Sequence, residues 1–443
     1  YLRSLGRCKV TGSDLRKTPA LAELEKQGIK VFTGHKKEHV KNADIVVYSS
    51  AIKPDNIERK STKKRKLAQF SRGNCLSQFM APYQRRIVVA GTHGKTSTTG
   101  MLIHVFDAAG VIPSFMIGGE MAAYGCNGRF SESSTFVTES DESDGSFLEL
   151  SPTAAIITNL EAEHLDYYKT KENLLNAFDT FSMNTHKNNG TLFYNKDNAD
   201  LATLCDNKAH TISFGINAKD ATYTAKNIQF NYENLSFTTY KNGKKQGRIT
   251  LNAMGQHNVY NALSTVALGI ESGLPFSAIQ KGLKAFQGIK RRMQLISNNN
   301  DIDIYDDYAH HPTEIQTTLT GLKQATNKNI TCIFQPHRYS RVSSQKTLFH
   351  TIFGDVHRLL IAPIYAANEP EPEQTNNSPP LINTIIDGIK AHASCDIHYF
   401  EDPKKILNFV KKTVQAGEIV ITMGAGDINQ ISASLASYYK EEA

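Results

Sequence analysis

The clearest hydrophobic pattern along the chain is an apolar run at residues 87–90 that ends in a polar loop containing two glycines, residues 91–97. A continuous apolar run of this length is typical of a strand buried on both faces of a parallel sheet. In residues 98–109 the apolar positions recur at helical spacing, and Gly110 follows as a natural stop. The pattern predicts a strand, a tight loop and a helix, in that order.

Similar alternations of short apolar runs and amphipathic segments fill the chain and predict an α/β fold of three domains. The pattern in residues 1–83 predicts a Rossmann-like domain. We expect this domain to be truncated, because residues 1–6 resemble the tail of its first helix and no opening strand or glycine-rich loop precedes them. Residues 84–294 predict a central P-loop ATPase domain with a parallel sheet. Alternating residues at 221–251 add a small antiparallel patch to it. Residues 295–443 predict a Rossmann-like C-terminal domain.

Composition narrows the class of protein. With 443 residues, 40% hydrophobic and 21% charged, the chain suits a soluble multidomain enzyme. The net charge of +7 fits either solubility or affinity for phosphorylated ligands, and the basic run at 63–66 fits a solvated helix face better than a nucleic-acid site. Six scattered cysteines without a Cys-x-x-Cys pair argue against a zinc site or a disulfide framework. No membrane-length apolar run or signal peptide is visible. We therefore expect a cytoplasmic protein, a monomer or weak homodimer, without nucleic-acid or membrane partners.

The loop at 91–97 has the chemistry of a phosphate cradle. Backbone N–H groups and a helix N-terminus attract anionic oxygens, Lys95 can neutralise the outer phosphates, and the Thr96 hydroxyl can ligate Mg²⁺. A full P-loop needs glycine where this chain has Val89, so the loop is a shortened variant. The expected nucleotide-binding residues of the loop are Gly91, Thr92, His93, Gly94, Lys95, Thr96 and Ser97.

Two polar side chains beyond the loop are candidate metal ligands. Glu139 and His164 each follow a short apolar strand, and the carboxyl ends of parallel strands meet at the edge of the sheet where the phosphate loop lies. Mg²⁺ prefers oxygen donors such as Thr96 and Glu139, while an imidazole is also compatible with Mn²⁺. Three neighbouring acids fit a helix cap or a solvated acidic loop better: Asp141, Glu142 and Asp144.

Two further strand ends are crowded with histidine, arginine and tyrosine, at residues 306–312 and 335–341. Such clusters suit the binding of a carboxylate or a phosphate better than solvated loops. Asn258 either caps the helix that follows it or reaches an adenine, and Arg292 either contacts phosphate or is solvated.

In this order, the motifs resemble those of the Mur ligases of bacterial cell-wall synthesis. The resemblance runs from the first residues to the C-terminus and is greatest to the member that adds L-alanine, to which the last two motifs are particular. The residues that carry it are 91–96, 139–144, 159–164, 255–258, 306–312 and 334–339.

The resemblance implies a UDP-sugar-binding, an ATP-binding and an amino-acid-binding domain. It implies ATP and Mg²⁺ (or Mn²⁺) as cofactors, and the joining of L-alanine to the carboxylate of UDP-N-acetylmuramate through an acyl phosphate. It also implies roles for individual residues. Those around ATP, beyond the loop, are Asn258, Arg292 and Asp307; those around the metal are Thr96, Glu139 and His164. Those near the substrates are Ser49, Ser50, Tyr308, His310, His337, Arg338 and Arg341; those expected to act in catalysis are Lys95, His310, His337 and Arg338.

Three departures from the family pattern stand out: Ala309 in place of a glycine, Glu163 in place of an aspartate, and the absent glycine-rich opening, which should bind the UDP diphosphate. Two alternatives remain. One is the recycling ligase that joins a whole peptide to the same sugar nucleotide, and residues 145–147 after the acidic motif fit the alanine-adding member better. The other is a non-catalytic nucleotide-binding remnant, against which the presence of Lys95 and Arg338 argues.

Overall fold

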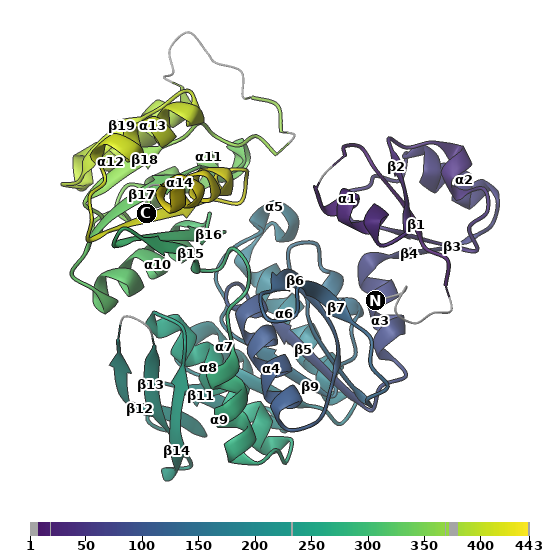
Figure 1. The fold of residues 1–443 in the computed structure, drawn as a ribbon. Helices are drawn as coiled ribbons and strands as arrows, with labels where there is room; N and C mark the ends of the chain where they lie inside the picture. The colour runs from purple at the N-terminus through teal and green to yellow at the C-terminus, as the bar shows by residue number, and fades with distance from the viewer. Residues whose placement is uncertain (1–7, 18, 232–233, 368, 372–379, 442–443) are drawn as a thin grey trace.

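The computed structural model describes residues 8–17, 19–231, 234–367, 369–371 and 380–441. It has the α/β architecture that the alternating pattern predicts (Figure 1). The strands of this part of the chain form one ten-stranded sheet, one six-stranded sheet and two sheets of two strands. Residues 1–6, predicted to be the tail of a helix, lie outside the described residues.

The ten-stranded sheet contains the predicted strand before the phosphate loop, β5 (Arg85–Ala90), near its middle. Its order is β14-β13-β12-β11-β10-β9-β5-β8-β6-β7; the pairings from β12 to β6 are parallel and those beyond them at both ends are antiparallel. The predicted antiparallel patch is therefore an extension of this sheet. The other strands are β6 (Ser114–Met121), β7 (Cys126–Arg129), β8 (Thr135–Glu139), β9 (Ala154–Ile157), β10 (Thr191–Asn195), β11 (Thr211–Gly215), β12 (Tyr223–Phe230), β13 (Leu235–Lys241) and β14 (Lys244–Leu251).

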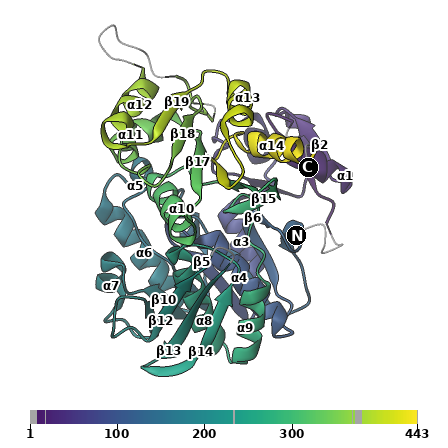
Figure 2. The ribbon, with the colours of Figure 1, turned by 60° about the vertical axis from the view of Figure 1, so that its left-hand side comes forward.

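Side chains of β5 are buried on both faces of this sheet, as the apolar run predicts. Ile87 and Val89 pack in one core and Val88 and Ala90 in another, because successive side chains point to opposite faces. Helices cover both faces (Figure 2). On the first face they are α4 (Lys95–Ala108), α8 (Gln256–Glu271) and α9 (Phe276–Ala285); on the second, α6 (Lys171–His186) and α7 (Ala199–Cys205).

The six-stranded sheet has the order β15-β16-β20-β17-β18-β19, and only the β15–β16 pairing is antiparallel. Both β16 and β17 pair in parallel with β20, so their carboxyl ends lie at one edge of the sheet. The strands are β15 (Gln294–Asn299), β16 (Ile302–Asp307), β17 (Asn329–Phe334), β18 (Arg358–Ile361), β19 (Asp396–Tyr399) and β20 (Glu418–Met423). The helices are α10 (Pro312–Ala325), α11 (Tyr339–Phe349), α12 (Leu381–His392), α13 (Pro403–Thr413) and α14 (Asn429–Glu441).

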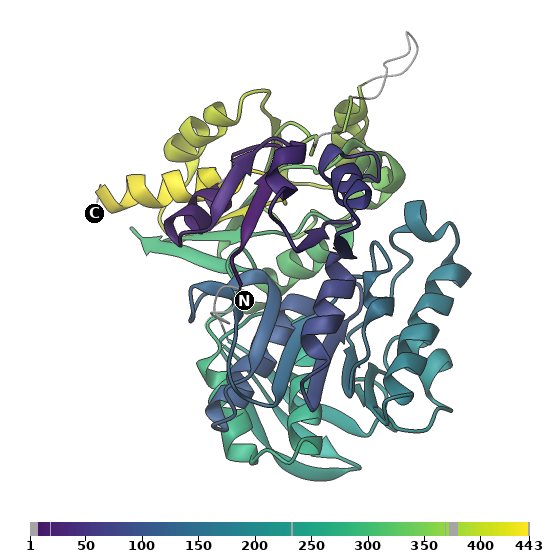
Figure 3. The ribbon, with the colours of Figure 1, turned by 90° about the vertical axis from the view of Figure 1, so that its right-hand side faces the viewer.

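The elements before β5 form two separate parallel pairs, β1–β2 and β3–β4, instead of one sheet. These elements and the six-stranded sheet lie on the same side of the central unit (Figures 1 and 3). Among all the described residues, no helix combines the length and apolarity needed to cross a bilayer. The N-terminal elements are β1 (Thr11–Asp14), α1 (Pro19–Lys26), β2 (Lys30–Thr33), β3 (Ile45–Tyr48), α2 (Ile57–Lys64), β4 (Ala68–Ser71) and α3 (Arg72–Met80).

The contact between α9 and α4 holds the helix that follows the phosphate loop, and Gly282 permits that contact. A Cβ added at Gly282 would lie 2.5 Å from Val105 Cα and 2.7 Å from His104 O, which are backbone atoms that cannot turn aside. We expect Gly282→Ala to lower the free energy of unfolding by about 1–3 kcal/mol, because overpacking outweighs the better helix propensity of alanine. Gly354→Ala is the matched control, since no atom of the described residues, apart from its chain neighbours, lies within 4 Å of its added Cβ, and its effect should stay within about 1 kcal/mol. Urea denaturation measures both, and equal effects would contradict this account of the contact.

Candidate active site

The phosphate loop is shaped by two glycines and by the end of the neighbouring strand β9. Gly91 and Gly94 have φ angles of +121° and +81°, and a Cβ at either would lie within 2.5 Å of Thr158 Oγ1 or Asn261 Oδ1. Thr158 Oγ1 donates to His93 O at 2.6 Å, which ties the loop to the end of β9. The loop is therefore held in one conformation ahead of the N-terminus of α4.

Lys95 is the first residue of α4, and its ammonium group points back into the loop. Its Nζ donates to Gly91 O (2.6 Å), Thr92 O (3.1 Å) and Glu142 Oε2 (2.9 Å). Burial alone would lower the pKa of Lys95, but the carboxylates of Glu142 and Asp141 raise it above its ordinary value. Lys95 is thus a fully charged cation at the loop.

The burial of Glu142 contradicts the expectation that this residue belongs to a helix cap or a solvated acidic loop. Its side chain is 1% exposed and accepts the hydrogen bond from Lys95, and burial raises its pKa against the opposing effect of that ammonium. Nothing in the polar run around it distinguishes Glu142 from its neighbours; only the fold after β8 turns it inward.

Two of the three candidate metal ligands touch one another. Thr96 Oγ1 donates to Glu139 Oε2 at 2.7 Å, and the other Glu139 oxygen accepts from the backbone N–H of Gly118. His164 lines the same cavity in a left-handed conformation, φ +56°, with Nε2 3.8 Å from Glu142 Oε1. Such strain in a residue other than glycine occurs often at functional sites.

This donor set fits a divalent cation. Thr96 and Glu139 offer a hydroxyl and a carboxylate, which are hard oxygen donors. Glu142 Oε1 is buried and makes no hydrogen bond within the described part of the chain, and the donor atoms of Asp141, Glu142 and His164 lie within 4.8 Å of one another. The residues present can therefore hold Mg²⁺, and the imidazole also admits Mn²⁺.

The three residues expected around ATP lie at the boundary between the two large sheets, where Asn258 and Asp307 are buried and Arg292 is partly exposed. Asn258 is not a helix cap, because α8 begins at Gln256 with Gly255 in the cap position; its amide donates to Met254 O at 2.7 Å. Arg292 lines the cavity with a side chain that is 33% exposed, and it pairs with Glu314 at 3.4 Å. Burial raises the pKa of Asp307 to about 6, although Arg292 opposes that shift.

The strand-end cluster comes from the loops after β16 and β17. The ring of His310 packs against that of His337 at 5.5 Å between centroids, and His337 stacks on Tyr365. Arg341 Nη1 lies 3.2 Å from His337 Nδ1, and Arg338 Nε donates to Glu369 Oε1 at 2.7 Å. Burial lowers the pKa of both histidines to about 4, so their imidazoles are neutral at pH 7.

One cavity of about 1460 Å³ joins these groups. Its lining includes the loop from Thr92 to Ser97 and the candidate residues Glu139, His164, Asn258, Arg292, Asp307, Tyr308, His310, His337, Arg338 and Arg341. Gly91 is not part of the lining, and neither are Ser49 and Ser50. Burial alone would raise the pKa of Asp144. Hydrogen bonds, first from Ser146 and then from Ser50, nevertheless lower this pKa below its ordinary value.

Besides Glu142, two acidic residues of this cavity and its surroundings are not predicted from the sequence, Glu314 and Glu369. Glu314 lies one turn after His310, and its Oε1 is 3.4 Å from His93 Nδ1. Its position in the first turn of a predicted helix, where acidic residues are common, is its only local signal. Glu369 reaches Arg338 and Ser340 from a loop about thirty residues away, and no local pattern marks it.

The sequence of this chain is similar to those of known proteins over nearly its whole length. Family models described as Mur ligase family catalytic domain, Mur ligase middle domain, and Mur ligase glutamate ligase domain match residues 4–84, 89–269 and 291–426. A UDP-N-acetylmuramate–L-alanine ligase from Geotalea uraniireducens is 38% identical over 98% of this chain and 93% of that protein. Its counterpart from Acetivibrio thermocellus is 36% identical over 95% and 89%.

Solved structures agree with these matches. A UDP-N-acetylmuramate–alanine ligase from Thermotoga maritima superposes with a TM-score of 0.83 at 26% identity, covering 98% of this chain and 94% of that chain. A murein peptide ligase from Psychrobacter arcticus gives 0.68 at 26% identity, covering 99% and 94%. From its sequence matches over nearly all of its length, this chain belongs to the Mur ligase family.

Proposed function

We propose that this chain joins L-alanine to the carboxylate of UDP-N-acetylmuramate at the expense of ATP. The observation that carries the proposal is the single cavity in which a phosphate loop with a charged lysine faces a cluster of arginines and neutral histidines. The curated relatives that match nearly the whole chain are ligases for this sugar nucleotide and L-alanine. The reaction needs both halves of such a cavity, one for a triphosphate and one for an amino acid.

Activation of the acid would take place at the loop. The muramoyl carboxylate attacks the γ-phosphorus of ATP, giving an acyl phosphate and ADP; the amine of alanine then attacks the acyl carbon and phosphate leaves. Two anions repel each other in the first step, so the Lys95 ammonium and the N–H groups at the start of α4 stabilise the phosphoryl oxygens. Asn258, Arg292 and Asp307 are proposed to hold the rest of ATP.

Thr96, Glu139 and His164 are the residues proposed to hold the cation. When bound, Mg²⁺ supplies positive charge to the phosphate oxygens and so lets a carboxylate approach them. Glu139 is oriented for this role by the Gly118 N–H on its other oxygen.

The proposed alanine site uses Arg338 or Arg341 for the carboxylate, by paired charge-assisted hydrogen bonds. The hydrogen bonds of the two histidines assign their tautomers. His310 Nδ1 lies 2.9 Å from Tyr308 O and must carry the proton, which leaves Nε2 as an acceptor. His337 Nδ1 faces the Arg341 guanidinium, which can only donate, so the proton of His337 is on Nε2. His310 is therefore proposed to accept a hydrogen bond from the amine. A base with a pKa of about 4 is suited to orienting the amine rather than to storing its proton.

The remaining assignments follow the three family matches. The units at 1–83, 84–294 and 295–443 are proposed to bind the UDP-sugar, ATP and the amino acid, with Ser49 and Ser50 at the UDP-sugar. The hydrogen bond between Ser50 and Asp144 supports this for the first unit, because it joins that unit to the loop after β8.

The proposal is tested by phosphate release in the presence of ATP, UDP-N-acetylmuramate and L-alanine. Release should require all three, and a tripeptide should not replace alanine. Lys95→Ala should lower turnover by at least about 100-fold, because it removes a charge that stabilises the transition state. The variant should still fold, although with a lower melting temperature, since Glu142 loses its cation but can take up a proton.

Lys63→Ala, at an exposed position in the last turn of α2, is the matched control and should keep wild-type turnover. Release with the tripeptide in place of alanine would indicate the recycling ligase. Turnover of Lys95→Ala within tenfold of wild type would contradict the role of the loop.

The histidine assignment makes a separate prediction about pH. A histidine with a lowered pKa stays neutral until the pH falls through the folded value, here about 4, so His310 should not titrate between pH 6 and 9. We expect His310→Ala to lower kcat/KM for alanine about 10-fold or more, by loss of a hydrogen bond to a charged or polar amine. The ratio of kcat/KM between wild type and variant cancels the titration of alanine itself and should be flat over this range. An inflection of that ratio near pH 6.5 would show that His310 acts by gaining and losing a proton.

A further inference from the structure

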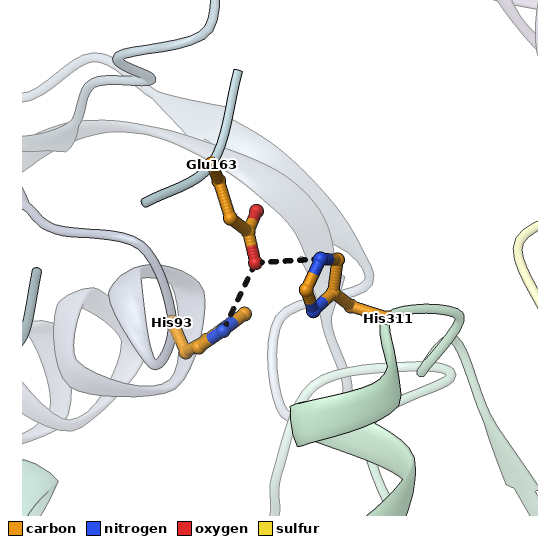
Figure 4. Close-up of side chains that lie close together, drawn as sticks. All are labelled: His93, Glu163 and His311. Atoms are coloured by element: carbon orange, nitrogen blue, oxygen red, sulfur yellow. Dashed lines mark ion pairs between the residues drawn. The ribbon is translucent and has the colours of Figure 1, made fainter. Parts of the chain in front are cut away.

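Two imidazoles and a carboxylate converge at the phosphate loop: those of His93, Glu163 and His311 (Figure 4). Glu163 Oε1 lies 3.3 Å from His93 Nε2 and 3.0 Å from His311 Nε2. One donor atom from each of the three residues lies within 4.8 Å of the other two. His93 and Glu163 belong to the central unit, whereas His311 immediately precedes α10 of the C-terminal unit.

Two of the three residues in this cluster, His93 and Glu163, have buried donor atoms that are poorly satisfied by hydrogen bonds, whereas His311 Nε2 meets the side-chain amide of Gln345. The side chains of His93, Glu163 and His311 are 16%, 13% and 8% exposed. Within the described residues, Glu163 Oε1 and both ring nitrogens of His93 make no hydrogen bond of good geometry, in spite of their ion-pair distances. Buried polar atoms of this kind usually have a partner, which an ion would supply.

Two further carboxylates surround His93. Glu161 Oε2 lies 3.5 Å from His93 Nε2, on the side of Glu163, and Glu314 Oε1 lies 3.4 Å from Nδ1, on the opposite side of the ring. A carboxylate behind one ring nitrogen, with the other directed at a cation, is the usual setting of a metal-binding histidine.

We propose that His93, Glu163 and His311 bind a divalent transition-metal ion of the zinc or cobalt type, with Glu161 as a fourth donor. Nitrogen and oxygen ligands about 2.0–2.1 Å from a tetrahedral ion stand about 3.3 Å apart, which the separations from Glu163 Oε1 match. Two imidazoles select such ions, whereas the oxygen donors of Thr96 and Glu139 select Mg²⁺. The two sites therefore differ in chemistry although they line one cavity.

An ion in this site would connect the phosphate loop to the C-terminal unit. A hydrogen bond crosses the same boundary beside the site, from Thr313 Oγ1 to Glu161 Oε2 at 3.1 Å. Gln345 from α11 also reaches the site, with its side-chain amide nitrogen 2.5 Å from His311 Nε2 and its oxygen unpartnered among the described residues. The bound ion is expected to hold the two units together and to raise the melting temperature.

The test is a titration of the full chain with Co²⁺, in excess Mg²⁺ to occupy the oxygen site and without nucleotide. Wild type should bind one Co²⁺ with the visible ligand-field bands of tetrahedral coordination, and Zn²⁺ should displace it. Glu163→Gln and His311→Gln should weaken binding by at least about tenfold each. His93 is left unchanged because it belongs to the phosphate loop.

His164→Gln is the matched control, since it removes the imidazole of the other cluster, Asp141, Glu142 and His164. It should retain the Co²⁺ bands and the increase in melting temperature. Absence of tetrahedral bands in wild type would overturn the proposal. Equal Co²⁺ binding by wild type and all variants would also overturn it, and so would loss of Co²⁺ binding in His164→Gln alone. None of these outcomes bears on the ligase reaction. Melting curves without metal establish that each variant is folded.

Discussion

The ion pair between Lys95 and Glu142 is the interaction on which the rest of the site depends. The ammonium group of Lys95 also fixes the geometry of the loop, because it donates hydrogen bonds to the carbonyl oxygens of Gly91 and Thr92. Glu142 is 1% exposed, and a buried carboxylate separated from its cation costs about 3–5 kcal/mol. The pair thus joins the loop after β5 to the loop after β8, and the hydrogen bond from Thr96 to Glu139 links the start of α4 to the end of β8.

Parallel strand pairing brings the remaining groups to the cavity. In the central sheet β8 and β9 flank β5, so the residues after all three strands emerge at one edge. In the C-terminal sheet β16 and β17 flank β20 in the same way, and the loops after them carry the histidines and arginines. The boundary between the two sheets is densely charged: Arg292 and His93 both contact Glu314, and His311 contacts Glu163. These contacts explain why residues of both units line one cavity.

Much of this arrangement could be predicted from sequence because its signals are local. The apolar run before the phosphate loop, the alternation at 221–251 and the polar clusters after β16 and β17 each mark an element and the edge where its loop emerges. Other features depend on contacts between distant residues. Glu142 sits in a polar run that looks solvated, Glu369 meets Arg338 across a long loop, and the cap at Gly255 rather than Asn258 depends on where α8 begins. No periodicity or composition encodes such contacts, so only the folded structure reveals them.

The central claim is that an acid is phosphorylated at the loop and then meets an amine in the same cavity. It is tested most directly with UDP-N-acetylmuramate labelled with ¹⁸O in both carboxyl oxygens, with mass analysis of the phosphate released. Transfer through an acyl phosphate predicts one labelled oxygen in each phosphate, because the bridging oxygen comes from the acid and leaves with phosphorus. Unlabelled phosphate, formed by attack of water on ATP, would contradict the account.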